Sequence, residues 1–220
     1  RISLSKMDKP FSIFLSKAQT YTSAAGGSIP DGGPQTAYPL TVSGLSPTTI
    51  DTIFGLETIC INISHSWSYD LAIAIQSPDG NIVDLSVNNG WGGSDYTNTC
   101  FNGFGATSIV MGVPPFTGTF RPQGYIGSLN NGQVGNGVWN LLITDDSFGD
   151  IGNLISWNIT FGNTPSKPFP FYSSNLPIVV LNTLGQTIAD DPKITCDMGI
   201  IYNGVGVRNY MTDVFNNYNG

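Results

Sequence analysis

Three aspartates stand close together in one short stretch of the sequence, where they could bind a cation. Asp145, Asp146 and Asp150 lie in the turn TDDSFGD, and Asp70 begins a strand that could reach the same edge. Ca²⁺ takes hard oxygen ligands from carboxylates, amides and carbonyls. The sequence therefore predicts a calcium site made by these four residues, although their spacing does not match an EF-hand loop. The alternative is that they form Asx turns with their own backbone.

The same carboxylates do not predict a catalytic centre. A Ser-His-Asp relay needs a histidine to move protons, and His65 is the single histidine of the chain. It stands in SHSWSYD, where we expect a structural role at a strand end. A hydrolase that uses Asp145 and Asp150 as paired carboxylates is disfavoured, because nothing else in the sequence suggests a sugar cleft. We predict that the chain is not an enzyme.

The acidic turn lies between two runs in which apolar residues occupy every second position. They are Trp139, Leu141 and Ile143 before the turn, and Ile155, Trp157, Ile159 and Phe161 after it. A period of two is typical of strands that bury one face. Similar runs cover 59–63, 71–76, 82–87 and 108–113, and the turn SPDG joins the second to the third. Many short strands without helical periodicity predict an all-β sandwich.

Composition narrows the classes of partner. Charged residues make up 10% of the chain, and the net charge of -7 argues against nucleic acid, which needs clustered Lys and Arg. The sequence contains no run of about 18 apolar residues, so it does not predict a membrane span. The N-terminal RISLSKMDKP lacks the apolar core of a signal peptide, so we expect a chain that is either cytosolic or already processed.

The three cysteines have no metal-ligand spacing. Cys60, Cys100 and Cys196 stand far apart in the sequence. A disulfide between two of them, most plausibly Cys60 with Cys100, is one prediction. Buried free thiols, which pack like small apolar groups, are the other.

From about residue 44 to residue 162 the chain resembles the P domain (homo-B domain) that accompanies subtilisin-like proprotein convertases and occurs in many bacterial secreted proteins. Three segments carry the resemblance in order: ISHSWSYDLAIAIQSPDGNIVDL, PPFTGTFRP and NGVWNLLITDDSFGDIGNLISWNITF. The resemblance implies a jelly-roll-like β-sandwich in an extracellular setting. It also implies a recurrent calcium site, without fixing the ligands.

Residues 173–220 resemble the segment that precedes the kinase-like fold of CotH-type surface proteins, through SSNLPIVVLNTLGQTIADDPKI. This resemblance implies a secreted bacterial architecture and no phosphotransfer.

The expected organisation is an N-terminal extension strand in 1–19, the P-domain-like sandwich in 20–162, and a linker with a C-terminal β extension in 163–220.

The two extensions contain strand-like runs outside the sandwich. They are Phe11, Ile13 and Leu15 at one end and Ile178, Val179, Val180 and Leu181 at the other. A lone apolar strand leaves backbone groups unpaired, so each run must join its own sandwich or a neighbouring molecule. The main functional prediction is a non-catalytic, calcium-stabilised structural or assembly subunit at the cell surface, whose partners are copies of itself, in a ring or fibre. The alternative is a P-domain accessory module joined to neighbouring domains of a larger surface protease or CotH-like enzyme.

Three minor features carry weaker expectations. Trp91 lies in a polar loop and could form the platform of a carbohydrate-binding module. Thr52, in Asp51-Thr52-Ile53, resembles an O-glycan acceptor of bacterial secreted proteins. Asn62 and Asn158 fit the N-linked sequon, but both lie in expected strands.

Overall fold

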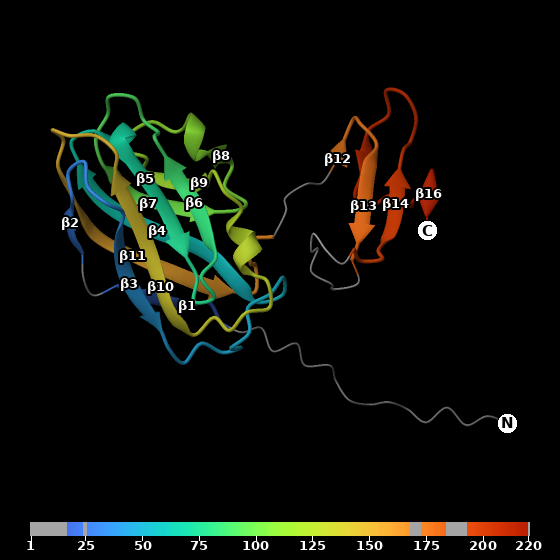
Figure 1. Ribbon diagram of the computed structural model, residues 1–220, viewed down its shortest axis with the longest axis horizontal. Coiled ribbons are helices and arrows are strands. Elements are labelled where there is room, and N and C mark those ends of the chain that lie inside the picture. Colours follow the sequence, from blue (N-terminus) through green and yellow to red (C-terminus); the bar gives the residue numbers. More distant parts are fainter. Residues whose placement is uncertain (1–16, 24–25, 168–172, 184–192, 220) are drawn as a thin grey trace. The chain divides into compact units, whose positions relative to one another are not determined.

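The computed structural model describes residues 17–23, 26–167, 173–183 and 193–219. The chain divides into two compact units, residues 1–169 and 170–220. The described residues form strands and three short 3-10 helices (Figure 1). None of the described helices is long and apolar enough to cross a membrane.

Two sheets make up the first unit. The larger sheet runs in the order β1 (Gln19–Thr22), β11 (Gly152–Gly162), β4 (Gly55–His65), β7 (Tyr96–Asn102), β9 (Gly118–Arg121) and β8 (Thr107–Ser108), and β2 (Gly27–Ile29) also pairs with β11. The smaller sheet runs in the order β3 (Thr36–Val42), β10 (Gly137–Asp145), β5 (Leu71–Gln76) and β6 (Ile82–Val87). All pairs are antiparallel except those of β9 with β7 and β8.

The apolar core lies between the inner faces of these two sheets. Alternate residues of β4 (Ile59, Ile61 and Ile63) and of β10 (Trp139, Leu141 and Ile143) are buried in it. Side chains from opposite sheets interdigitate in such a core, and the alternate positions face outwards. The prediction of an all-β sandwich is therefore confirmed.

Two details of the expected strands are wrong. Ile155 was expected on the buried face, but its side chain is 62% exposed, while Leu154 is buried. A register shift between Leu154 and Ser156 inserts an extra residue, which reverses the alternation ahead of Trp157. Residues 108–113 do not continue as a strand, because Ile109–Met111 form a short 3-10 helix.

A disulfide joins two strands of the larger sheet. It connects Cys60 of β4 with Cys100 of β7, which are direct register partners, and closes a sequence separation of 40 residues. The prediction of a disulfide between Cys60 and Cys100 is confirmed. Cys196 is a free thiol in the second unit.

The second unit is a small β structure of its own. β13 (Ile178–Asn182) pairs with β14 (Asp197–Ile201), which also pairs with β16 (Tyr218–Asn219), and β12 (Ser173–Ser174) pairs with β15 (Asn209–Tyr210). The sequence indicates no partner within the extension for the run Ile178–Leu181. This expectation is wrong, because the run pairs with β14. Residues Phe11, Ile13 and Leu15 lie outside the described residues.

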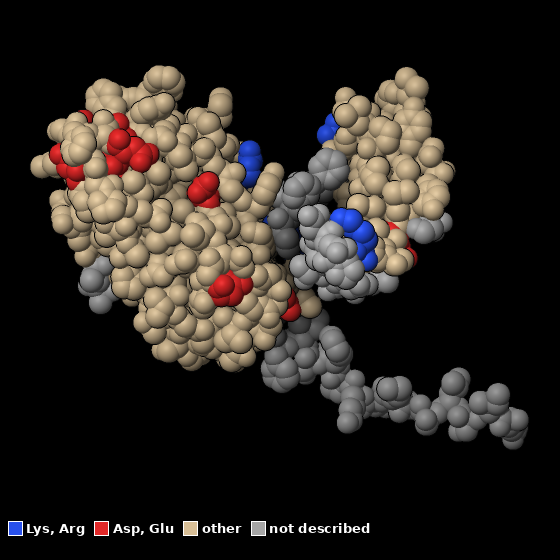
Figure 2. Space-filling view, in the orientation of Figure 1, with Lys and Arg blue, Asp and Glu red and all other residues tan. Residues whose placement is uncertain are grey.

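Figure 2 shows how few charges the surface carries. On the face shown, most of the carboxylates of the sandwich gather in one region that has no basic side chain within it.

Candidate functional site: an acidic edge with a buried His–Asp pair

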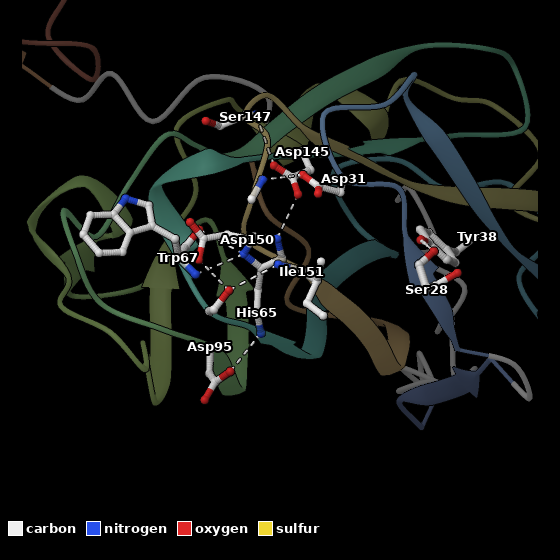
Figure 3. A network of polar contacts seen from close by, with 12 residues as sticks. Ser28, Asp31, Tyr38, His65, Trp67, Asp95, Asp145, Ser147, Asp150 and Ile151 are labelled. Carbon is white, nitrogen blue, oxygen red and sulfur yellow. Dashed lines mark hydrogen bonds and ion pairs between the residues drawn. The ribbon is translucent and has the colours of Figure 1, made fainter.

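The acidic edge, which we define as Asp70, Asp145, Asp146 and Asp150, forms where strands of both sheets end. Figure 3 shows two of its members, Asp145 and Asp150, with the residues that they contact. Asp145 is the last residue of β10, in the smaller sheet, and Asp146 and Asp150 follow it in the turn to β11. Asp70 closes the 3-10 helix η1 (Ser68–Asp70), which connects β4 to β5. The backbone N–H of Asp146 donates to the carbonyl oxygen of Asp70 at 2.8 Å, which holds the two segments together.

A buried pair of polar side chains joins the two sheets at this edge. His65, the last residue of β4, and Asp145 have side chains that are 0% exposed, and His65 Nε2 lies 3.1 Å from Asp145 Oδ2. The Trp67 N–H donates to His65 Nδ1 at 3.2 Å. His65 Nδ1 also lies 3.0 Å from the carbonyl oxygen of Trp67, so the backbone of Trp67 holds the other side of the ring. The single histidine therefore positions Asp145, a residue 80 positions away.

The second carboxylate oxygen of Asp145 is used by its own turn. Asp145 Oδ1 accepts the backbone N–H of Ser147 at 3.2 Å, which is the hydrogen bond of an Asx turn. Gly152 lies directly opposite His65 in the ladder of β4 and β11. A Cβ at this position would stand 2.3 Å from the His65 ring. Glycine is therefore needed here for the imidazole to reach Asp145.

The other end of the acidic turn is also held by hydrogen bonds. The Ser66 hydroxyl donates to Asp150 Oδ1 at 2.7 Å, and its oxygen accepts the Ile151 N–H at 3.2 Å. Asp31, from the segment after β2, accepts the Gly149 N–H at 2.9 Å. These contacts fix the turn against η1 and against the N-terminal part of the sandwich.

The carboxylates of the edge are close enough to affect one another. Burial raises the pKa of Asp70, and the negative charges of Asp145, Asp150 and Asp146 raise it further, whereas His65 opposes the rise. Like charges near one another disfavour ionisation. The edge therefore carries an electrostatic cost at neutral pH, which a cation could reduce.

The arrangement is not a preformed metal site. Across the described parts of the chain, no group of three or more His, Cys, Asp or Glu side chains lies close enough together to hold a metal ion. Asp145, the most buried of the predicted ligands, already binds His65 and Ser147. As they lie here, the predicted ligands do not fit calcium, and the calcium site stays a prediction.

The site also lacks the geometry of a serine-type relay. The two ring nitrogens of His65 face Asp145 and the backbone of Trp67, so neither is bonded to a serine hydroxyl. A nucleophile must be within hydrogen-bond reach of its base. The histidine here has a structural position at a strand end.

The remaining predicted residues lie elsewhere. Thr52 is exposed in the turn before β4, and its carbonyl oxygen accepts a hydrogen bond from Lys167 Nζ at 2.6 Å. Asn62 lies within β4, where its side chain bonds Ser156 and the backbone of Asn98. Neither position belongs to the acidic edge.

The sequence singles out Trp91, but not the two aromatic side chains beside it that adjoin the edge. Trp67 precedes η1 and Tyr69 lies within it, and the ring of Tyr69 lies 5.3 Å from the ring of Trp91. Tyr69 directly precedes Asp70, so a search for aromatic residues next to the candidate aspartates would have found it.

Fold and site together define a disulfide-bonded β-sandwich whose acidic edge is organised by a buried histidine. Residues 57–161 match the family model of the Proprotein convertase P-domain, so this part of the chain is a P domain. The resemblance to this family is confirmed. Nothing tests the resemblance of residues 173–220 to CotH-type proteins.

A curated relative carries the same domain in a longer protein. Leupeptin-inactivating enzyme 1 of Streptomyces exfoliatus is 29% identical over 144 residues, which cover 65% of this chain and 26% of that protein. Two solved structures are also similar. The serine protease of Aeromonas sobria in complex with its chaperone matches with a TM-score of 0.40 at 18% identity, and the same protease alone with 0.37 at 17%. Each match covers 67% of this chain and 26% of the solved chain, so this chain spans about a quarter of the proteins it resembles.

Proposed function

We propose that this chain is a non-catalytic accessory module of a larger secreted bacterial peptidase. The observation that carries the proposal is the P domain in residues 57–161 together with its relative, an enzyme named for inactivating leupeptin, of which the match covers only 26%. The rest of that protein offers ample room for a catalytic domain. In this proposal the P domain contributes stability and a binding surface, while another domain performs the hydrolysis.

The geometry of the site favours a structural role over a catalytic one. His65 is buried and bonded to Asp145, so it is not available to a substrate. The acidic edge instead closes one end of the sandwich. Removal of one partner from a buried pair of this kind is strongly destabilising, which suits a structural role.

The disulfide supports a location outside the cytosol. Disulfides persist in oxidising compartments and are rare in the cytosol of most organisms. The Cys60–Cys100 bond links adjacent strands of the larger sheet. We therefore place the protein in the extracellular space, which agrees with a secreted enzyme.

An antibody raised against this chain would test the proposal. It is used to isolate the native polypeptide from the culture medium and from cell extracts. We expect a polypeptide well above 23.5 kDa in the medium, from which the antibody removes a peptidase activity. A native polypeptide of the size of this chain, or a larger one whose removal leaves all peptidase activity behind, would contradict the proposal.

Assembly into a ring or fibre at the cell surface remains a separate prediction. It rests on two strand-like runs without a partner in the sequence, of which Ile178–Leu181 pairs with β14. Deletion of residues 1–19 tests what remains. If light scattering gives the truncated and full chains the same oligomeric state, strand donation from the N-terminal end is wrong.

A further inference from the structure

Next to the acidic edge, aromatic side chains form an exposed surface that the accessory role does not explain. The aromatic platform, as we call it, consists of Trp67, Tyr69 and Trp91. The Trp91 side chain is 81% exposed and that of Trp67 is 42% exposed. The rings of Tyr69 and Trp91 lie 5.3 Å apart with an angle of 30° between their planes. Tyr69 therefore lies beside the indole of Trp91, most of which remains exposed to solvent.

The platform is held firmly by the loops that carry it. The N–H and the hydroxyl of Ser68 both donate to the carbonyl oxygen of Gly93, at 2.8 and 2.9 Å. Asn88 Nδ2 donates to the carbonyl oxygen of Tyr69 at 2.9 Å. Gly92 lies against the Trp67 ring, since a Cβ on it would stand 3.1 Å from the indole. A fixed aromatic surface loses little conformational entropy when a ligand binds.

Negative charge adjoins the platform directly. Asp70 follows Tyr69 in the chain, and Asn88 links the Tyr69 backbone to the carboxylate of Asp146, which it contacts at 3.5 Å. Asp150 binds Ser66, the residue before Trp67, and Figure 3 shows Trp67 and Asp150 next to each other. Asp146 is exposed, so its charge faces solvent.

Two of the three basic side chains of the described sandwich, Arg121 and Lys167, are engaged elsewhere. Arg121 donates to the carbonyl oxygens of Gly105 and Ala106, and Lys167 donates to that of Thr52. On the face shown in Figure 2, the acidic region contains no basic side chain. Arg121 and Lys167 therefore leave the carboxylates beside the platform to a ligand.

A flat, weakly hydrated cation matches both the aromatic platform and the carboxylates beside it. The guanidinium group of arginine stacks on aromatic faces and bonds carboxylates, and tryptophan is the best aromatic partner for it. Trp, Tyr and Arg are also the residues that dominate binding energy at protein interfaces. A neutral sugar could stack on Trp91 but would gain little from three neighbouring negative charges.

We propose that the aromatic platform and the aspartates beside it bind an arginine-containing basic segment of a partner polypeptide. Trp91 receives the guanidinium group on its exposed indole, and Asp70, Asp146 and Asp150 face the neighbouring positive charges. The proposal does not depend on the accessory role, because it concerns a surface of the P domain itself.

Peptide titration of the full chain tests the proposal. Acetylated and amidated hexa-arginine is titrated by calorimetry in 0.05 M and 0.5 M NaCl, and hexa-glutamate, cellohexaose and chitohexaose serve as comparison ligands. Trp91→Ala is compared with Phe104→Ala, which removes an exposed aromatic ring beyond the opposite end of β7. Asp146→Asn is compared with Asp84→Asn, an exposed carboxylate on β6. Thermal melting of each variant confirms that it is folded.

We expect saturable binding of hexa-arginine that weakens at high salt, because exposed charge pairs are screened. Trp91→Ala should weaken binding about two- to fivefold, which corresponds to an exposed cation–π contact. Asp146→Asn should weaken it in low salt, and the two matched controls should not. Failure of hexa-arginine to bind, or an equal loss in the Phe104→Ala protein, would overturn the proposal. Binding of a neutral hexasaccharide that depends on Trp91, without binding of the peptide, would assign the platform to carbohydrate instead.

Discussion

Removal of the imidazole of His65 should destabilise the sandwich far more than removal of any exposed charge at the acidic edge. His65 and Asp145 have fully buried side chains, and their hydrogen bond connects the larger sheet to the smaller one. In a His65→Ala protein, Asp145 keeps only the Ser147 N–H as a partner for a carboxylate that stays buried. Removal of one member of a buried charged pair costs about 3–5 kcal/mol.

This cost is large compared with the stability of a typical domain, which is about 5–15 kcal/mol. For a protein of this length, 1 kcal/mol lowers the melting midpoint by about 2–4 °C. A loss of about 4 kcal/mol therefore lowers the midpoint by about 8–16 °C. Urea unfolding followed by tryptophan fluorescence measures the free energy directly, since Trp139 and Trp157 are buried in the core.

Two further variants separate the role of the buried pair from a general effect of mutation. Asp150→Asn removes a partly exposed charge whose neighbour is Ser66, and we expect a loss below about 1 kcal/mol. Joint replacement of His65 and Asp145 by Leu should cost less than His65→Ala, because no buried charge is left unpaired. Equal losses in the His65→Ala and Asp150→Asn proteins, to within about 1 kcal/mol, would refute the reasoning.

Three other perturbations have defined outcomes. Joint replacement of Cys60 and Cys100 by Ala should cost about 4 kcal/mol, because the bond closes 40 residues, and Cys196→Ser should leave stability unchanged; urea unfolding compares them. Asp70→Asn should raise the melting midpoint at pH 7 but not at pH 3. The pKa of Asp70 is raised in the folded state, so its contribution to stability falls as pH rises from its unfolded pKa through its folded pKa. If a calcium ion draws Asp70, Asp146 and Asp150 together, added calcium should raise the melting midpoint and EGTA should lower it. A midpoint that stays the same as in NaCl of equal ionic strength would contradict a structural calcium site.

The regular strands could be predicted from the sequence because their signal is local. Alternation of apolar residues located β4, β5, β6 and β10, and the SPDG turn located the β5–β6 hairpin. The bulge that exposes Ile155 could not be predicted in this way, because it depends on how β11 pairs with β4. The strand at Ile178–Leu181 was recognised, but its partner β14 contains a glycine and only two β-branched residues, which weakens its own strand signal.

The candidate site could be predicted only in part, for the same physical reason. The four aspartates stand out by type and spacing, and the structure brings them to one edge. The histidine that holds Asp145 lies 80 residues away, and the loop of Trp91 contacts Tyr69 across 22 positions. Contacts of this kind follow from the order of strands in both sheets, which local patterns do not contain.

The acidic edge therefore combines two roles that different residues perform. Asp145 faces inwards, where His65 and Ser147 use both of its oxygens, so it can contribute to folding but not to recognition. The Asp146 side chain faces solvent and makes one long contact, so the carboxylate can meet a ligand while it contributes little to folding. If this division is correct, His65→Ala should lower stability without changing the affinity of the folded protein for hexa-arginine. Trp91→Ala should weaken the binding of hexa-arginine without lowering stability. A His65→Ala protein that is folded but no longer binds the peptide would mean that the inward pair also sets the geometry of the platform, through the Trp67 N–H that His65 accepts.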